Sequence, residues 1–514
     1  MNSSRRVRVR FAPSPTGPLH IGGVRTALFN YLFARQHGGD FLLRIEDTDQ
    51  GRFVEGAEAY ILEALRWCGM EPDESPAHGG AYGPYRQSQR KDLYGKYVEQ
   101  LLERGHAYYA FDTPEELDAM RQRLKAARVV SPQYNAITRE QMKNSLTLPA
   151  DEVAQRLASG EPYVVRFKIP RKEEVRLEDA VRGWVMVHSS TLDDKVIMKS
   201  DGMPTYHLAN VVDDHLMEIT HVIRGEEWLP SAPLHVLLYK AFGWEETMPT
   251  FAHLPLLLRP DGNGKLSKRD GDRLGFPVFP LDWKNEATGE TAMGFREQGY
   301  LSEAVVNMLA LLGWSQGNNE ELFTMEELIE KFSLKRVNKS GTKFDKDKAL
   351  WFNQSYLRQL PDQVLGTYYQ NEAQKAGYLV ELSDAIKYAN LVKERAVFLS
   401  DLWRDGAFFV ISPESYDEQI VSKKWTSDAV KGLSVFVDLL ENETGDFDAQ
   451  RSKAAFAEAL ATQGIKMGKV MQPLRLSISG VGVGPELMDV LQALGREEII
   501  RRIRRAITAL QVNA

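Results

Sequence analysis

The sequence contains one cysteine, Cys68, among 514 residues. A single thiol excludes an internal disulfide and any zinc site built from several cysteines. Cys68 closes an amphipathic stretch, so an inert core thiol is expected, with a nucleophile as the alternative. Because disulfides belong mainly to oxidising compartments, their exclusion favours a reducing, cytoplasmic location.

Long apolar runs are also missing. The longest candidates, Phe251–Leu258 and Val305–Trp314, fall short of the ~18 residues of a membrane span. The basic segment Met1–Arg10 is followed by a proline-rich stretch, not by the apolar core of a signal peptide. We therefore expect no membrane partner. With 39 glycines and 23 prolines, collagen-like and low-complexity chains are excluded. The net charge of −7 argues against indiscriminate coating of nucleic acid but allows local basic patches.

The start of the chain predicts a parallel α/β sheet. Residues 7–12 alternate as a strand, residues 13–18 form a Pro/Gly-rich loop, and residues 24–35 carry apolar side chains at helical spacing. A short buried strand follows at residues 41–45. This order of elements is typical of the start of a doubly wound sheet, in which ligands bind at the carboxyl ends of the strands.

The rest of the chain suggests further domains, as its length also does at about 150 residues per domain. Residues 110–200 resemble an α+β insertion, and residues 272–299 an irregular loop or small subdomain. Beyond residue 300 the pattern is helical, for example at 302–312, 385–402, 454–463 and 497–510. The glycine-rich Gly480–Gly484 is predicted to be a turn between helices, since Pro485 follows and no βαβ unit surrounds it.

The first strand-to-helix turn has the composition of a nucleotide site. Glycines in Pro13–Gly23 allow a nucleotide to approach the backbone, and a helix N-terminus suits phosphate. His20 could hydrogen-bond a phosphate oxygen as negative charge develops on it. Considered alone, a histidine in such a turn is more often structural.

A second segment, Gly262–Gly271, contains Lys265, Ser267, Lys268 and Arg269. A basic, glycine-bounded loop can fold over a triphosphate and neutralise its charge. The spacing is not that of a Walker loop. A merely solvated basic loop is the alternative when this segment is considered alone.

A third set lies at predicted strand ends: Arg10, Glu46 and Arg224, with Tyr206 and Asn210 close to Arg224 in the sequence. Two arginines can each form paired hydrogen bonds with a carboxylate, and a carboxylate can hold an ammonium. The set suits a small acidic amino acid. Structural ion pairs are the alternative.

These segments together resemble a known family. Pro13–Gly23 is similar to the HIGH motif of class I aminoacyl-tRNA synthetases, and the basic loop resembles their KMSKS motif. More narrowly, the similarity is to bacterial glutamyl-tRNA synthetases and runs essentially end to end. The segments that carry it are Arg10–Gly17, Arg44–Asp49, Gly83–Ser88 and Tyr206–His215. One departure is Gly23, which stands where the motif has its second histidine.

The resemblance implies a two-step reaction. The α-carboxylate of L-glutamate attacks the α-phosphorus of ATP, with Mg²⁺ bridging phosphates, and the glutamyl group then moves to the terminal ribose of tRNA(Glu). No protein nucleophile is required, so catalysis is positioning and charge stabilisation. By matching position, His20 and Lys268 are the implied catalytic residues. The implied glutamate-binding residues are Arg10, Ser14, Glu46, Tyr206, Asn210 and Arg224. The implied ATP-binding residues are Pro13, His20, Gly22, Gly23, Lys265, Ser267, Lys268 and Arg269.

Further expectations follow from the family. No zinc is expected, because the stretch around Ala107–Phe111 has no cysteine, and the protein is expected to be a monomer. Asp213-Asp214-His215 resembles a metal cluster, but a structural turn is favoured. Aromatic and basic side chains in the helical region are candidates for anticodon contacts, although each aromatic alone is more often core: Trp351, Phe352, Tyr356, Trp403 and Arg358.

The resulting fold class is an α/β doubly wound (Rossmann-type) catalytic domain with an α+β insertion and an all-α anticodon-binding region. The all-α tail separates this chain from glutaminyl-tRNA synthetases, which carry β-barrels, and from glutamyl-queuosine enzymes, which lack that region. A tRNA-binding protein without catalysis is an alternative, but it would not need the ATP motifs; a small nucleotidyltransferase would be much shorter. The expected segments are 1–112 (first catalytic half), 113–198 (acceptor-binding insertion), 199–260 (second catalytic half), 261–345 (KMSKS loop and helical connector) and 346–514 (anticodon-binding region).

Overall fold

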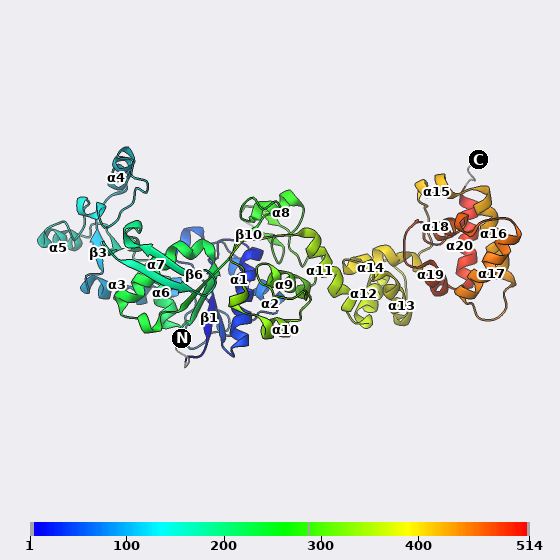
Figure 1. Ribbon diagram of the computed structural model, residues 1–514, viewed down its shortest axis with the longest axis horizontal. Helices are drawn as coiled ribbons and strands as arrows, with labels where there is room; N and C mark the ends of the chain where they lie inside the picture. The colour runs from blue at the N-terminus through cyan, green and yellow to red at the C-terminus, as the bar shows by residue number, and fades with distance from the viewer. Residues whose placement is uncertain (1–4, 286–287, 511–514) are drawn as a thin grey trace. The chain divides into compact units, whose positions relative to one another are not determined.

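The computed structural model describes residues 5–285 and 288–510, and it divides into two compact units (Figure 1). The first unit comprises Met1–Gln298 and Val305–Lys346. The second comprises Gly299–Ala304 and Asp347–Ala514. Its main part starts within one residue of the boundary that the sequence places at 346.

A mainly parallel sheet forms the centre of the first unit. Its strand order is β2-β1-β8-β9-β5-β6, and every neighbouring pair is parallel except β5 with β6. The parallel α/β sheet expected from the start of the sequence is thereby confirmed. The strands are β1 (Arg8–Phe11), β2 (Asp40–Leu43), β5 (Glu174–Asp179), β6 (Gly183–His188), β8 (His221–Gly225) and β9 (Thr250–Leu254).

The β5–β6 hairpin is placed differently from the expected insertion. Its sequence lies within 113–198, but β5 pairs with β9 and so extends the main sheet. One face of β5 is buried: Val175, Leu177 and Asp179 face the interior while the residues between them are exposed. The hairpin is thus part of the scaffold beneath the strand ends.

Helices cover this sheet and fill its core. Helix α1 (Ile21–Gln36) packs on β1, β2 and β8, and α7 (Ala232–Phe242) packs on β5. Cys68, just after α2, is buried, and burial raises the pKa of its thiol to about 12, as expected for an inert core thiol. The other helices here are α2 (Ala57–Trp67), α3 (Lys91–Glu103) and α6 (Tyr206–Leu216).

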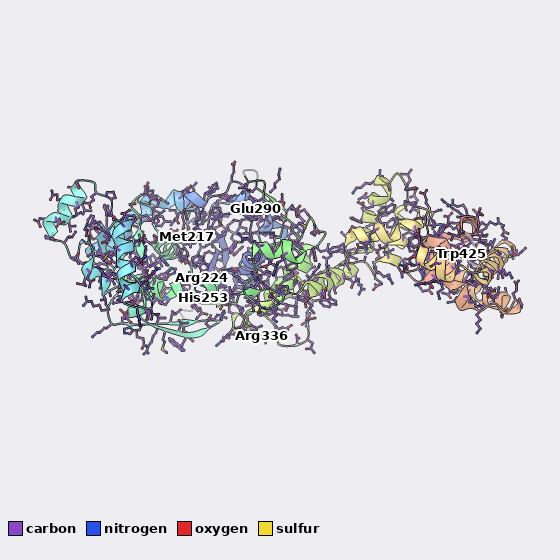
Figure 2. The ribbon with its side chains drawn as sticks, turned by 90° about the horizontal axis from the view of Figure 1, so that it is seen from above. Met217, Arg224, His253, Glu290, Arg336 and Trp425 are labelled. Atoms are coloured by element: carbon purple, nitrogen blue, oxygen red, sulfur yellow. The ribbon has the colours of Figure 1, made fainter. Side chains whose placement is uncertain are left out.

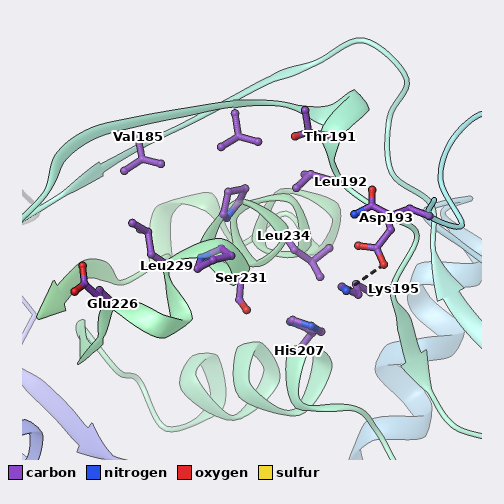
Figure 3. A pocket seen from close by; sticks show the side chains of 14 residues that line it. Val185, Thr191, Leu192, Asp193, Lys195, His207, Glu226, Leu229, Ser231 and Leu234 are labelled. Atoms are coloured by element: carbon purple, nitrogen blue, oxygen red, sulfur yellow. Dashed lines mark ion pairs between the residues drawn. The ribbon is translucent and has the colours of Figure 1, made fainter. Parts of the chain in front are cut away.

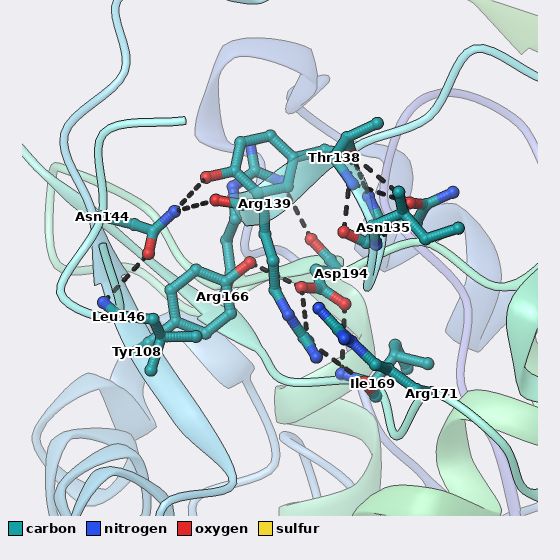
Figure 4. A network of polar contacts seen from close by, with 12 residues as sticks. Tyr108, Asn135, Thr138, Arg139, Asn144, Leu146, Arg166, Ile169, Arg171 and Asp194 are labelled. Atoms are coloured by element: carbon teal, nitrogen blue, oxygen red, sulfur yellow. Dashed lines mark hydrogen bonds and ion pairs between the residues drawn. The ribbon is translucent and has the colours of Figure 1, made fainter. Parts of the chain in front are cut away.

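The insertion has its own small antiparallel sheet, in the order β3-β4-β7. A buried carboxylate, Asp194, joins its parts: it accepts hydrogen bonds from Tyr108 Oη at 2.6 Å and Arg139 Nη1 at 3.0 Å (Figure 4). A fully paired buried charge of this kind holds the surrounding loops in one arrangement. The elements are β3 (Ala107–Ala110), α4 (Pro114–Ala126), α5 (Ala150–Ala158), β4 (Val164–Phe167) and β7 (Val196–Met198).

The segment after β9 is short and mixed in structure. Residues 272–299, expected to be irregular, contain only the end of a helix and a two-stranded hairpin among their described residues. The elements are β10 (Leu257–Leu258), α8 (Lys268–Leu274), β11 (Trp283–Lys284), β12 (Thr291–Ala292), α9 (Ser302–Leu311), α10 (Met325–Lys331) and β13 (Thr342–Lys343).

The second unit is helical, as predicted. The single helix expected at 385–402 is instead two, because Asp401 accepts hydrogen bonds from the backbone N–H groups of Val397 and Phe398 and so starts a new helix. Gly480, at φ +78°, ends α18 and opens the predicted turn. The helices are α11 (Lys346–Gln359), α12 (Asp362–Lys375), α13 (Leu382–Val392), α14 (Leu399–Gly406), α15 (Glu418–Lys424), α16 (Ser427–Asn442), α17 (Ala449–Thr462), α18 (Met471–Ser479), α19 (Leu487–Leu494) and α20 (Arg496–Ala509).

Candidate active site

A cavity of about 660 Å³ lies at the carboxyl ends of β1, β8 and β9. Three sequence segments that are far apart in the chain meet there, as the position of ligand sites in open α/β sheets leads one to expect. The predicted residues that line it are Arg10, Pro13, Ser14, His20, Gly22, Gly23, Glu46, Tyr206, Asn210, Arg224, Lys265 and Ser267.

Arg10 is held by a buried ion-pair network. Its Nε and Nη2 lie 3.0 and 3.2 Å from the two carboxylate oxygens of Asp214. Arg44, also fully buried, contacts Asp214 at 2.7 Å and Glu46 at 3.0 Å. Burial alone would raise the pKa of Asp214, but the two guanidiniums hold it below its ordinary value. The ion pairs form a chain that begins at Arg10 and ends at Glu46, and it holds both side chains in position.

Arg224 presents the unmatched positive charge of the site. Its guanidinium donates to Tyr206 Oη at 2.6 Å, to His253 Nε2 at 3.0 Å and to the Trp228 carbonyl at 3.3 Å. All three partners are neutral, and among the described residues no carboxylate forms an ion pair with Arg224. The side chain, labelled in Figure 2, is buried, and an arginine keeps its proton even where burial lowers its pKa, as it does here. The site therefore attracts an anion.

Glu46 offers the opposite charge within the same cavity. Its Oε1 accepts from Asn210 Nδ2 at 3.1 Å and from Arg44 Nη2 at 3.0 Å. A carboxylate has further lone pairs available, so Glu46 can also accept from an ammonium group. Exposed Ser14 lines the same cavity. Arg224 and Glu46 together suit a molecule that carries both charges.

His20 begins helix α1 as its N-cap. Its Nδ1 accepts from the Gly22 N–H at 3.1 Å, so the neutral ring carries its proton on Nε2. At Gly23 an added Cβ would lie 2.5 Å from a Leu19 methyl group, so that side chain would have to move. The turn therefore brings backbone and an imidazole donor to the cavity, an arrangement suited to phosphate.

The basic segment is only partly a loop. Ser267 caps α8 through Asp270, whose Oδ2 accepts from the Ser267 N–H at 2.8 Å. Lys265 pairs with Glu227 at 2.6 Å, and both line the cavity. The expectation of a loop throughout Gly262–Gly271 is thus wrong from residue 268 onward.

Two predicted ATP-binding residues differ from the others. Arg269 is exposed and is not among the residues that line the cavity. Lys268 is the first residue of α8, and its side chain lies outside the described part of the structure. Their roles stay predictions.

Asp213, Asp214 and His215 are structural, but they lie in helix α6 and do not form a turn. Asp213 pairs with Arg90 at 2.7 Å, and His215 stacks on Trp244 with ring centroids 3.7 Å apart. These contacts with residues of other elements stabilise Asp213 and His215 in their positions on helix α6. In the described residues, no group of three or more His, Cys, Asp or Glu side chains is arranged to hold a metal ion.

Several cavity residues were not predicted. Trp228 packs against the Tyr206 ring with centroids 4.6 Å apart, and Arg52 lines both the main cavity and a smaller one of about 90 Å³ beside it. Thr48 and Asp49 line the smaller cavity; they follow Glu46 within the motif that carries the family resemblance. These residues follow Glu46 or Arg224 within a few positions in the sequence, and this proximity was the signal that could have identified them.

A second cavity of about 650 Å³ lies between strand β6 and helices α6, η5 (Glu226–Ser231) and α7 (Figure 3). Apolar side chains such as Leu229 and Leu234 dominate its wall, with an ion pair between Lys195 and Asp193 at 3.1 Å. His207 also lines it, and burial lowers the pKa of that imidazole to about 4. The ring is thus neutral at physiological pH.

The anticodon candidates of the second unit differ in exposure. Trp351 is 38% exposed, whereas Phe352 is buried at 2%; Phe352 is therefore core and is not available to stack on a base. Tyr356 and Trp403 are partly buried, and Arg358 is exposed. Among the described residues, no helix has both the length and the apolar character needed to cross a membrane.

Comparison with known families agrees with this geometry. The family model for the catalytic domain of class I tRNA synthetases (E and Q) matches residues 6–351. A model for an anticodon binding domain matches residues 348–507. The chain belongs to the class I tRNA synthetases of the E and Q group.

Individual proteins give a more specific match than the family models do. The chain is 60% identical to a glutamate–tRNA ligase of Cytophaga hutchinsonii over 99% of this chain and 98% of that protein. It is 56% identical to one of Porphyromonas gingivalis, over 99% of each. A crystal structure of a glutamate–tRNA ligase from Elizabethkingia meningosepticum, in complex with its amino acid, matches with TM-score 0.93 and 51% identity, covering 99% of this chain and 100% of that one.

Proposed function

We propose that this chain is a glutamate–tRNA ligase, which activates L-glutamate with ATP, releases pyrophosphate and transfers the glutamyl group to the 3′-terminal adenosine of tRNA(Glu). The observation that carries the proposal is the cavity that joins an unmatched buried arginine, Arg224, to a carboxylate, Glu46. Glutamate has the complementary charges, an ammonium and a side-chain carboxylate. Glutamine would leave Arg224 without a counter-ion, which disfavours its binding.

The glutamate-binding roles follow from these charges. Arg224, with Tyr206 holding its guanidinium, pairs with the side-chain carboxylate, and Arg10 attracts the α-carboxylate. Glu46 accepts from the ammonium, helped by Ser14, and Asn210 fixes Glu46. The α-carboxylate would then face the phosphate side of the cavity, where in-line attack on ATP requires only correct placement.

ATP is proposed to bind along the first turn and the basic segment. Gly22, Gly23 and Pro13 bring backbone close to the nucleotide, and His20 donates from Nε2 to a phosphate oxygen. Lys265, Ser267, Lys268 and Arg269 are proposed to neutralise the phosphates. The substrate is MgATP, because Mg²⁺ is usually held by phosphates and few protein ligands.

Partners and location are proposed on the family's pattern. The second unit matches an anticodon binding domain, and we propose that it contacts the anticodon of tRNA(Glu). A monomer in the cytoplasm, without bound zinc, is proposed for the same reason.

The test is attachment of labelled glutamate to purified tRNA(Glu), with tRNA(Gln) in parallel and glutamine as a competing amino acid. Charging of tRNA(Glu) alone indicates a discriminating enzyme, and charging of both tRNAs a non-discriminating one. Failure to charge either tRNA, with tRNA still bound, would favour a tRNA-binding protein and contradict the proposal.

Lys268→Ala is expected to slow glutamyl-adenylate formation by about 10²- to 10³-fold, the usual cost of removing one group that stabilises developing charge. The affinity for tRNA should change far less. Pyrophosphate exchange with tRNA present gives the rate, and filter binding gives the affinity. Lys240→Ala, which removes an exposed lysine paired with Glu173, is the control. Equal losses of rate and affinity would contradict the proposed contact with ATP.

A further inference from the structure

Three neighbouring strands of the main sheet place Arg224, His253 and Asp179 in a row. Arg224 on β8 pairs in register with His253 on β9, and β5, on the other side of β9, ends at Asp179. Arg224 Nε donates to His253 Nε2 at 3.0 Å, and His253 Nδ1 lies 2.6 Å from Asp179 Oδ2. His253 and Asp179 have no exposed side-chain surface, and Figure 2 labels Arg224 and His253 beside each other.

These contacts determine where the imidazole proton lies. Because Nε2 faces an N–H donor, it must accept, so the neutral ring carries its proton on Nδ1 and donates it to Asp179. Burial, followed by the nearby positive charge of Arg224, lowers the pKa of His253, which favours the neutral ring. Burial opposes ionisation of Asp179, yet its hydrogen bond from His253 and those from backbone N–H groups lower its pKa overall.

The other carboxylate oxygen of Asp179 is equally constrained. Oδ1 accepts from the backbone N–H groups of Val181 at 3.0 Å, Arg182 at 2.8 Å and His253 at 3.2 Å. The carboxylate is therefore fixed in position by the turn of the β5–β6 hairpin. The imidazole ring lies between this carboxylate and Arg224 and contacts both.

We propose that Asp179 and His253 are positioning residues that orient Arg224 and thereby determine recognition of the substrate's side-chain carboxylate. The inference rests on the proposed function. With Nε engaged by His253, the guanidinium can offer a carboxylate only its Nη1/Nη2 edge. A carboxylate bound directly to Arg224 would occupy the group that the substrate needs. The imidazole instead lies between Asp179 and the guanidinium. Nη1 and Nη2 each donate one N–H, to Tyr206 Oη and to the Trp228 carbonyl, and each has a second N–H for the substrate's carboxylate.

Asp179→Asn tests this arrangement with little change in shape. The amide nitrogen would donate to His253 Nδ1, which moves the ring proton to Nε2, against the Nε–H of Arg224. The KM for glutamate is expected to rise by about 10- to 100-fold, the usual effect of losing a hydrogen bond to a charged group. The kcat and the KM for ATP should change little, and the preference for glutamate over glutamine should fall with the rise in KM.

The matched control is Asp194→Asn, which removes another buried aspartate, in the insertion. Both variants lose a buried charge, but only Asp179→Asn should alter the KM for glutamate at saturating tRNA. A wild-type KM and glutamine preference in Asp179→Asn would overturn the inference while leaving the proposed function intact. Failure of the wild-type protein to charge tRNA with glutamate would instead overturn the proposed function.

A second pair of variants applies if Asp179→Asn does not fold, as judged by circular dichroism. His253→Gln provides a carbonyl oxygen that can accept from Arg224, whereas His253→Leu provides none. The glutamine variant should retain a KM for glutamate near that of the wild type, and the leucine variant should show the larger rise. Equal KM values in the two variants would overturn the inference.

Discussion

Asp214→Asn is expected to destabilise the first unit by about 3–5 kcal/mol, the cost of leaving buried charges without their partner. Asp214 is 2% exposed and contacts both Arg10 and Arg44. Without its charge, only Glu46 remains to balance Arg44, and Arg10 loses its ion pair. Because the pKa of Asp214 is held below its ordinary value, this stabilising contribution is complete at neutral pH and is lost as the pH falls through the lowered pKa.

Hydrogen exchange measures this effect locally, which suits a chain of two units that need not unfold together. Amides of β1 should lose protection in Asp214→Asn. Asp194→Asn should loosen the insertion and leave β1 protected. Adding Arg44→Gln to Asp214→Asn should cost less than the two single changes summed, since the second removes a charge that the first left unpaired. Unchanged protection of β1 would show that the ion-pair network does not stabilise this strand.

The cavity was predictable from sequence because its residues lie at ends of recognisable strands. Arg10 and Arg224 are each the second-last residue of a buried strand, β1 and β8, and parallel strands bring such ends to one edge. The family motifs then connected these positions to His20. What the local pattern could not show was the set of partners that hold them. Asp214 lies 204 positions from Arg10, and nothing near either residue indicates the pair.

Local signals were also present that the prediction did not use. Ser267 and Asp270 have the spacing of a capping box, and they start helix α8 where a loop was expected. In contrast, the turn expected at Asp213–His215 rested on the family resemblance and on the nearby substrate residues, and aspartates are poor helix formers. Their ion pairs with Arg90 and Arg10 outweigh that preference, and such tertiary contacts are not visible in local sequence.

The β5–β6 hairpin shows that strand pairing, like side-chain pairing, cannot be predicted from local sequence. Alternating burial of β5 was consistent with a strand in the insertion or in the main sheet. Pairing with β9 selects the main sheet, and this pairing brings Asp179 to His253. A residue from the segment expected to form the insertion therefore lies beneath the cavity that Arg224 lines.

Arg224→Ala is expected to lower kcat/KM for glutamate by about 30- to 5,000-fold, which corresponds to the 2–5 kcal/mol lost when one partner of a buried, hydrogen-bonded charge pair is removed. Most of the loss should appear in the KM for glutamate, because the proposed partner of Arg224 is the side-chain carboxylate and not the reacting α-carboxylate. Use of glutamine should fall much less, since its amide never formed the ion pair. Discrimination between the two amino acids should weaken accordingly.

The matched control is Arg166→Ala, which removes another buried arginine, in the insertion, that donates to a carbonyl and lies 4.0 Å from the Tyr134 ring centroid. With tRNA saturating, this variant should retain the wild-type KM for glutamate. Pyrophosphate exchange over a range of glutamate and glutamine concentrations measures both quantities. An unchanged dependence on glutamate in Arg224→Ala would remove Arg224 from the pocket, and the Asp179–His253 pair would then have no bound carboxylate to act upon.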